Sequence, residues 1–210
     1  MPIPKQASWM IRKILEARVT LQHLQFDPNR PKSFLQQAYL QFIGDRPRVP
    51  WKCMVFHNTS RSKAQFNTWL QLQGRLLTAY RLAKWGMDVQ QDCVLCELQQ
   101  ETRDHPIVHC NYVKLIWQKV LNWIRQPLRQ VATWEQHMAW VLSKAKGRSQ
   151  QAQVFKMVYT ETVYAICLER NQRVFEKKKR EWHMVAKDIA YQCYLRAPVG
   201  IQNYVLKLKF

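Results

Sequence analysis

Four potential metal ligands lie within eighteen residues near the middle of the chain, and they constrain the fold more than any other feature. Cys93, Cys96, His105 and Cys110 have the spacing Cys-x2-Cys-x8-His-x4-Cys. Two thiolates two residues apart can bind one Zn²⁺ from a tight turn, and a histidine and a cysteine downstream complete a tetrahedron. A closed four-ligand site leaves no position for a reactive water, so we predict a structural Zn²⁺ whose role is in folding.

Alternatives to this ligand set stay open at the level of sequence. His109 is a competing ligand, but it adjoins Cys110, and neighbouring residues rarely both point at one ion. Pro106 directly follows His105, which disfavours a helix there and suits a ligand on a loop. The remaining cysteines, Cys53, Cys167 and Cys193, lack partners at metal spacing and are interpreted as small buried residues. The simplest competing interpretation is that the clustered cysteines are a coincidence.

The start of the chain bears on the compartment. Its first 18 residues, MPIPKQASWMIRKILEAR, lack the uninterrupted apolar segment of a secretory signal. We therefore expect an intracellular, reducing compartment, where clustered cysteines more often bind metal than pair as disulfides. Residues 8–24 form a basic amphipathic helical pattern that also suits an organellar transit peptide, so a mitochondrion or another organelle is favoured over the nucleus or cytoplasm.

The balance of charge indicates a polyanionic partner. The chain has 33 Lys and Arg against 14 Asp and Glu, a net charge of +19. Residues 1–86 carry +11 and residues 113–210 carry +12, whereas residues 87–112, which contain the cluster, carry −4. Such an excess opposes compaction and is usually tolerated because nucleic acid neutralises it. No apolar run is long enough to cross a membrane, and no membrane partner is expected.

The spacing of apolar residues predicts a mostly α protein: a helical domain organised around a structural zinc loop, with a long basic C-terminal helical region. Helical periodicity covers residues 8–24, 33–43, 63–85, 113–124 and 150–194, the last broken once, and we interpret the aromatic stripes as core. Three segments follow: 1–62, a basic helix and Pro-rich connector; 63–125, the zinc-binding domain; and 126–210, a basic helical region. The tail after residue 198 alternates apolar residues with lysine and predicts an edge strand or an extended tail.

Basic residues also recur on one side of the last helical region. Arg170, Arg173, Lys177, Arg180 and Lys187 fall on one face if the helix is continuous, opposite an apolar face. A docked helix would lay such a stripe along a phosphate backbone, so these five are the predicted nucleic-acid-binding residues. A solvated charged face is the alternative.

The stretch from Trp69 to Trp117, WLQLQGRLLTAYRLAKWGMDVQQDCVLCELQQETRDHPIVHCNYVKLIW, resembles a known family. It is similar to the reverse-transcriptase zinc-binding domain that follows the polymerase in plant LINE-type retroelements. The matching features are Leu77-Thr78, the Cys-x2-Cys pair, Glu101-Thr102, His105, Cys110 and the closing Trp117. The flanks resemble the family more loosely, at Ser8-Trp9 and at Glu169-Arg170-Asn171. The resemblance implies the same four zinc ligands, and we expect a stand-alone, domesticated descendant of such an element.

The sequence has no polymerase signature, nucleotide-binding loop or defensible catalytic triad, so we expect no enzymatic activity. We predict a zinc-containing RNA-binding subunit of a ribonucleoprotein particle, such as an organellar ribosome, that binds structured RNA and neighbouring proteins. One alternative is a nucleic-acid-binding remnant of a retrotransposon polyprotein, and another is a protein-interaction adaptor. Because the zinc loop is acidic, we expect it to pack against the basic halves or against a partner protein and not to face RNA.

Overall fold

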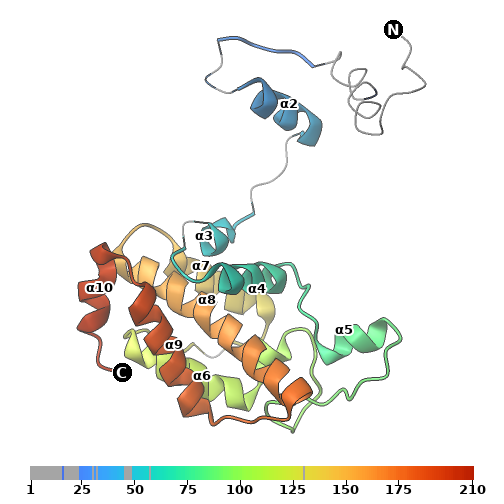
Figure 1. Ribbon diagram of the computed structural model, residues 1–210, viewed down its shortest axis with the longest axis vertical. Helices are drawn as coiled ribbons and strands as arrows, with labels where there is room; N and C mark the ends of the chain where they lie inside the picture. Colours follow the sequence, from blue (N-terminus) through green and yellow to red (C-terminus); the bar gives the residue numbers. More distant parts are fainter. Residues whose placement is uncertain are drawn as a thin grey trace. The chain divides into compact units, whose positions relative to one another are not determined.

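A computed structural model describes residues 16, 24–29, 31, 33–44, 49–56, 58–129 and 131–210 (Figure 1). The chain forms two compact units, residues 1–49 and 50–210. The described residues are mostly helical, which confirms the predicted fold class. The predicted helix over residues 8–24 lies outside the described residues except at Glu16 and Leu24.

The first unit contains α2 (Phe34–Ile43), which matches the short helix predicted over residues 33–43. The helix begins where the Ser33 side chain accepts a hydrogen bond from the backbone N–H of Gln36. The Gln37 side chain donates to the Asp27 carbonyl and accepts from its N–H, which ties the preceding segment to the helix.

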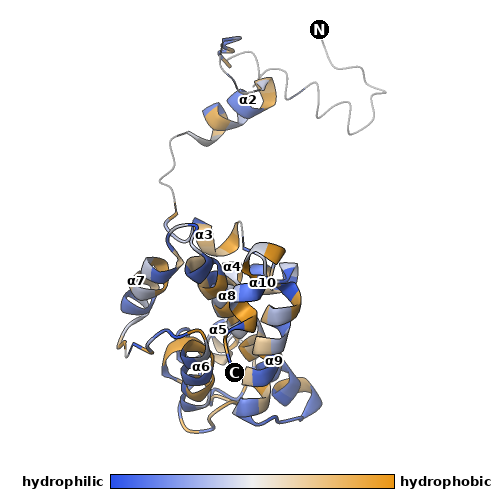
Figure 2. Cartoon of the chain, turned by 90° about the vertical axis from the view of Figure 1, so that its left-hand side faces the viewer, coloured by the Kyte–Doolittle hydropathy of each residue, from blue (hydrophilic) through white to orange (hydrophobic). Residues whose placement is uncertain are grey.

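The second unit packs its helices around one central helix. Its elements are α3 (Lys52–Val55), α4 (Ser62–Leu72), α5 (Ala79–Lys84), η1 (His105–His109), α6 (Asn111–Trp123), α7 (Trp134–Ala145), α8 (Gln150–Asn171), η2 (Gln172–Glu176), α9 (Trp182–Arg196) and α10 (Val199–Leu206). The central helix is α8, against which α4, α7 and α9 pack, while α6 packs against α9 (Figure 1). Apolar residues gather along α8 and α4 where the helices meet (Figure 2).

The core joins residues 63–125 to residues 126–210. Val113, Ile116, Val120 and Leu121 of α6 are fully or almost fully buried, as their helical spacing predicts. The ring of Trp117 stacks on that of Tyr159 in α8, with centroids 5.2 Å apart. Burying large aromatic side chains stabilises a small domain strongly. The predicted boundaries after residues 62 and 125 therefore lie inside one compact unit.

The predicted helix over residues 63–85 is two helices. Gly74 has a φ of +63°, a conformation that costs glycine little, and it ends the turn after α4. Thr78 then starts α5 by accepting a hydrogen bond from the N–H of Arg81. Phe66 and Tyr80 belong to the aromatic stripes interpreted as core, but Phe66 in α4 and Tyr80 in α5 are exposed, and so is Leu77 just before α5.

The last third contains the predicted break but not the predicted tail. The α-helix α8 continues into the π-helical turn η2, and residues 177–181 then interrupt the helical region before α9. The segment predicted to be extended forms α10, because Ile201 and Val205 lie one helical turn apart and are both buried. The Leu208 carbonyl beyond α10 accepts a hydrogen bond from Nε1 of Trp123. No helix in the described ranges is long and apolar enough to span a bilayer.

Candidate metal centre

The four predicted zinc ligands lie together. One ligand atom each from Cys93, Cys96, His105 and Cys110 lies within 4.8 Å of all the others. The Sγ atoms of Cys93 and Cys110 are 3.9 Å apart, and Cys96 Sγ lies 3.3 Å from His105 Nε2. Zn–S bonds of about 2.3 Å in a tetrahedron place two sulfurs roughly 3.8 Å apart. The residues therefore fit a tetrahedral metal ion with three sulfur ligands and one nitrogen ligand.

A short turn brings the first two cysteines together. The backbone N–H of Glu97 donates to the Cys93 carbonyl at 2.8 Å, and Glu97 has a φ of +55°. An isolated antiparallel bridge between Asp92 and Gln100 closes the base of this turn. The turn orients both sulfurs to one side, which is the local geometry that the Cys-x2-Cys spacing predicts.

The other two ligands flank a single π-helical turn. His105 begins η1 and Cys110 follows it, with the Cys110 N–H donating to the His105 carbonyl at 2.9 Å. The expectation of a loop at His105 is therefore wrong, because Pro106 lies in the first turn of η1, where its missing N–H costs no helical hydrogen bond. Cys110 also directly precedes α6, so metal binding would anchor that helix. His109, the competing ligand, lies outside the cluster.

The sulfur pair favours an ionised thiol. The hydrogen bond between the two sulfurs lowers the pKa of Cys93 and raises the pKa of Cys110. A thiolate is the form of cysteine that binds metal, so the lowered pKa of Cys93 favours metal binding at this residue. Cys193 is buried away from the cluster, while Cys53 and Cys167 are half-buried.

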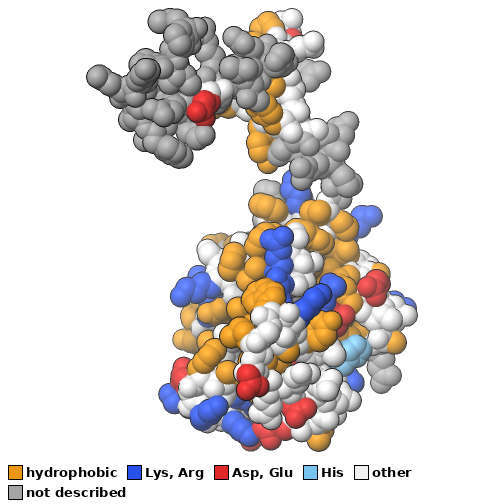
Figure 3. Space-filling model, turned by 90° about the vertical axis from the view of Figure 1, so that its right-hand side faces the viewer, with side chains coloured by type: hydrophobic (Ala, Val, Ile, Leu, Met, Phe, Trp, Pro, Cys, Tyr) orange, Lys and Arg blue, Asp and Glu red, His pale blue; other side chains and the backbone are white. Residues whose placement is uncertain are grey.

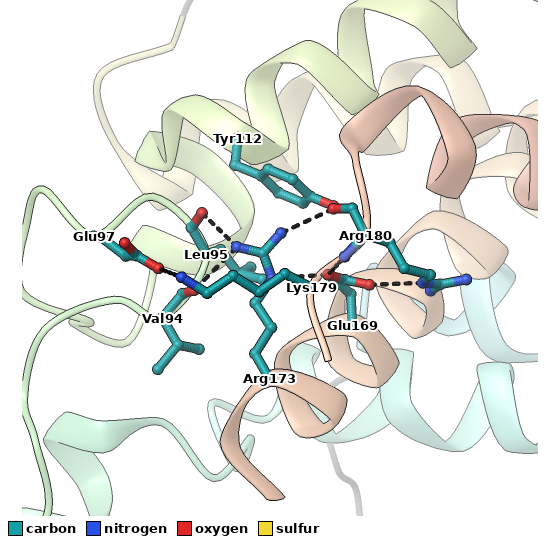
Figure 4. A network of polar contacts seen from close by, with 8 residues as sticks. All are labelled: Val94, Leu95, Glu97, Tyr112, Glu169, Arg173, Lys179 and Arg180. Atoms are coloured by element: carbon teal, nitrogen blue, oxygen red, sulfur yellow. Dashed lines mark hydrogen bonds and ion pairs between the residues drawn. The ribbon is translucent and has the colours of Figure 1, made fainter. Parts of the chain in front are cut away.

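The cysteine turn is held against the C-terminal region by Arg173 (Figure 4). Nη1 of Arg173 donates to the carbonyls of Val94 and Leu95, the two residues between the first two cysteines, at 3.2 and 3.0 Å. Its guanidinium lies over the ring of Tyr112, 4.4 Å from the centroid. Lys179 pairs with Glu97 on the same turn. The acidic loop therefore packs against the basic C-terminal region, as the charge pattern predicted.

Glu169 at the end of α8 organises this contact. Its two oxygens accept from Nε of Arg173 at 2.7 Å, from Nε of Arg180 at 2.8 Å and from the Arg180 N–H at 3.0 Å (Figure 4). Burial alone would raise the pKa of this fully buried carboxyl, but these hydrogen bonds outweigh it, so the pKa of Glu169 is lowered. The carboxylate stays ionised and compensates two guanidiniums.

The predicted basic stripe is not continuous. Arg170 lies in α8, Arg173 in η2, Lys177 and Arg180 in the connection and Lys187 in α9, because the helix breaks between them. Arg170 donates to Glu101, which is buried beside the zinc loop, at 2.8 Å. Arg180 also pairs with Asp188 at 2.7 Å. Lys177 and Lys187 are exposed. Nucleic-acid contact by these five residues stays a prediction. Three of them, Arg170, Arg173 and Arg180, pair with buried glutamates of this chain.

Sequence reasoning missed the carboxylates that hold these arginines. Glu169 and Arg173 lie four residues apart, a spacing that pairs charges on a helix and could have indicated their contact. Glu101 and Arg170 are 69 residues apart, and no local pattern connects them.

One comparison with known proteins bears on this site. Residues 34–117 match the model of a family described as zinc-binding in reverse transcriptase. All four clustered residues fall within the matched range. No curated protein and no solved structure shows a significant match.

Proposed function

Because residues 34–117 match the family model of a reverse-transcriptase zinc-binding domain, we propose that this protein is a non-enzymatic, zinc-containing RNA-binding protein. The observation that carries the proposal is the cluster of three cysteines and one histidine inside that domain, in a chain with a net charge of +19. Cys93, Cys96, His105 and Cys110 would hold Zn²⁺, which would cross-link the turn, η1 and the start of α6. Four protein ligands suit a structural ion.

The positive charge would supply the binding energy. Lysine and arginine side chains that neutralise phosphates release condensed counterions, which gives affinity without sequence preference. We place the protein in a ribonucleoprotein particle, such as a ribosome of a mitochondrion or another organelle, because subunits of such particles combine small size with high positive charge. The host particle is an analogy with other basic proteins.

One observation weighs against the adaptor alternative, in which the acidic loop is a docking surface. Glu97 pairs with Lys179, Glu101 with Arg170 and Asp104 with Arg103. Three of the five acidic residues in 87–112 therefore already have partners in this chain. A retroelement remnant stays the second candidate, since it shares the family of the zinc-binding domain.

The test is affinity purification from the native source, divided into nuclease-treated and untreated halves, with zinc measured in the same samples. We expect ribosomal or other structured RNA to co-purify with particle proteins, and about one zinc per chain. Heterogeneous or element-derived nucleic acid would favour the remnant. Protein partners that survive nuclease and high salt, with no nucleic acid, would overturn the proposal in favour of the adaptor.

A further inference from the structure

Four arginines of the second unit are paired with buried glutamates. Such pairs join Arg61 to Glu161, Arg170 to Glu101, and both Arg173 and Arg180 to Glu169. Each glutamate is at most 1% exposed. These four guanidiniums are compensated within the fold, and contact with a phosphate would have to break a buried pair.

Arg81 and Arg103 are different. Nη1 of Arg81 donates to the carbonyl of Gly74 at 2.8 Å, and the guanidinium lies over the ring of Trp85, 4.9 Å from its centroid. Arg103 packs on the same glycine: a Cβ added to Gly74 would lie 3.0 Å from Nε of Arg103. The guanidinium of Arg103 lies 5.8 Å from the ring centroid of Trp134. Two guanidiniums thus converge on one backbone turn, each beside a tryptophan.

Little negative charge compensates them. The one carboxylate that lines the same pocket among the described residues is Asp104, which lies 3.4 Å from Arg103. Their side chains are 32% and 53% exposed, and a solvated pair of this kind contributes little, so one carboxylate faces the three cations Arg81, Lys84 and Arg103. In the part of the chain that the structure describes, neither Arg81 nor Lys84 has an acidic side chain within ion-pair distance. The turn therefore concentrates unbalanced positive charge, in contrast to the paired arginines of the core.

These side chains line a pocket of about 260 Å³ between α5, the turn at Gly74 and the start of α7. Trp85 and Tyr80 on its rim are 57% and 55% exposed, although large aromatic side chains are usually buried. The pocket is smaller than the roughly 300–1,000 Å³ of sites that enclose a drug-sized ligand, so it suits one planar group. Figure 3 faces the side on which α5 lies and shows Lys and Arg side chains among hydrophobic ones.

We propose that this pocket binds an unpaired nucleotide of single-stranded RNA, with the base stacked on Trp85 or Tyr80 and the adjacent phosphates held by Arg81, Lys84 and Arg103. Aromatic platforms flanked by basic side chains are how proteins bind single strands without reading their sequence. The inference rests on the proposed RNA-binding function and assigns to it a surface distinct from the predicted stripe.

The experiment measures binding of a fluorescent, unstructured 12-nucleotide RNA to the full chain by anisotropy over a range of salt. We expect Trp85→Ala to weaken binding roughly five- to hundredfold, the range for loss of one base stack. The double variant Arg81→Gln, Arg103→Gln should lower the slope of log K against log salt by about 1.4, or about 0.7 per phosphate contact.

Matched controls lie away from the pocket. Phe175→Ala removes another exposed aromatic side chain and should leave the affinity and the salt slope close to those of the wild type. Lys146→Gln with Arg148→Gln removes two exposed charges and should reduce the salt slope less than the pocket variant does. Zinc content and thermal melting check that each variant is folded. As a second measurement, ultraviolet crosslinking of the wild-type protein to 5-bromouridine RNA should modify Tyr80, Trp85 or Trp134.

The outcomes separate two failures. Wild-type binding that is lost in the pocket variants and kept in the controls supports the site. Wild-type binding that the pocket variants retain, with crosslinks elsewhere, overturns the site and leaves RNA binding intact. If the wild-type protein binds no RNA at all, the proposed function fails and this inference fails with it.

Discussion

At the scale of single residues, the fold depends on buried glutamates that pair with arginines. Glu169 shows why: its side chain is fully buried, yet it accepts hydrogen bonds from two arginines and a backbone N–H. Removing one partner of such a group leaves the others unpaired in a medium that solvates charge poorly. Removal of one partner therefore lowers the free energy of unfolding by more than the intact pair contributes to it.

Glu169→Gln tests this directly. The amide keeps the shape of the side chain but leaves the guanidinium of Arg173 without a compensating charge and Arg180 with only its exposed partner Asp188, so we expect a loss of about 3–5 kcal/mol in the free energy of unfolding. Urea denaturation measures it. Glu176→Gln is the control, because Glu176 pairs with Lys178 at an exposed site and should change stability by less than about 1 kcal/mol. Equal effects of the two variants would contradict the role of Glu169.

A second residue couples stability to pH. His137 is 5% exposed, its Nε2 lies 3.1 Å from the hydroxyl of Tyr159, and burial lowers its pKa to about 4. The unfolded chain, with a histidine pKa near 6.5, therefore binds more protons between pH 6.5 and 4. Stability from this group is present above pH 6.5 and is lost as the pH falls toward 4.

The predicted loss from this group is about 2 kcal/mol between pH 7.5 and 5. In His137→Gln the titrating group is gone, so the free energy of unfolding should fall less over the same interval. Urea titrations of both proteins at each pH give the difference between their free energies of unfolding. Acid acts on the metal ligands of both proteins alike, so that effect cancels in the difference. Parallel pH profiles would show that His137 does not couple protonation to folding.

At the scale of elements, the cluster joins the cysteine turn, η1 and the start of α6. Cys96→Ser should therefore abolish stoichiometric zinc and destabilise the second unit by several kcal/mol, because binding of a structural metal is coupled to folding. Metal analysis and thermal melting measure both. Cys53→Ser is the control, since Cys53 lies outside the cluster. An unchanged melting curve for Cys96→Ser would contradict a structural metal.

The two histidines at the ends of η1 give a finer test of the ligand set. His105 has its Nε2 beside Cys96, whereas His109 lies outside the cluster. His105→Ala should lower zinc content, and His109→Ala should leave it intact. The reverse result would exchange the two residues in the ligand set.

At the scale of the whole molecule, positive charge has two roles. Arg170, Arg173 and Arg180 hold the acidic loop on the C-terminal region, so their substitution would change stability together with any RNA binding. Lys177 and Lys187, from the same predicted stripe, are exposed and form no ion pair with a residue that the structure describes, so their effect on binding can be measured apart from folding.

We expect Lys177→Gln with Lys187→Gln to leave the urea midpoint unchanged and to lower the salt slope of RNA binding by up to about 1.4, if both contact phosphates. Arg170→Gln with Arg173→Gln should shift the urea midpoint, and the contrast between the two pairs separates binding from folding. An unchanged slope for the lysine pair would show that these two residues are only solvated.

The sequence by itself determined what depends on short spacing. The members of the Cys/His cluster lie within eighteen residues, and the buried face of α6 repeats every turn, so both could be identified without coordinates. The tail was misjudged as extended because its last residues alternate, although Ile201 and Val205 have helical spacing. Gly74 and Thr78 carried the local signal for the break before α5.

Only the tertiary structure decided which charges are free. Arg61 pairs with Glu161, 100 residues away in the sequence, and Arg170 pairs with Glu101, 69 residues away. These arginines are therefore part of the folded structure and are not free to bind a phosphate. The same packing leaves Trp85 exposed beside Arg81. The physical reason is that helix periodicity and ligand spacing are local, whereas the burial of a charge depends on which distant segment supplies its partner.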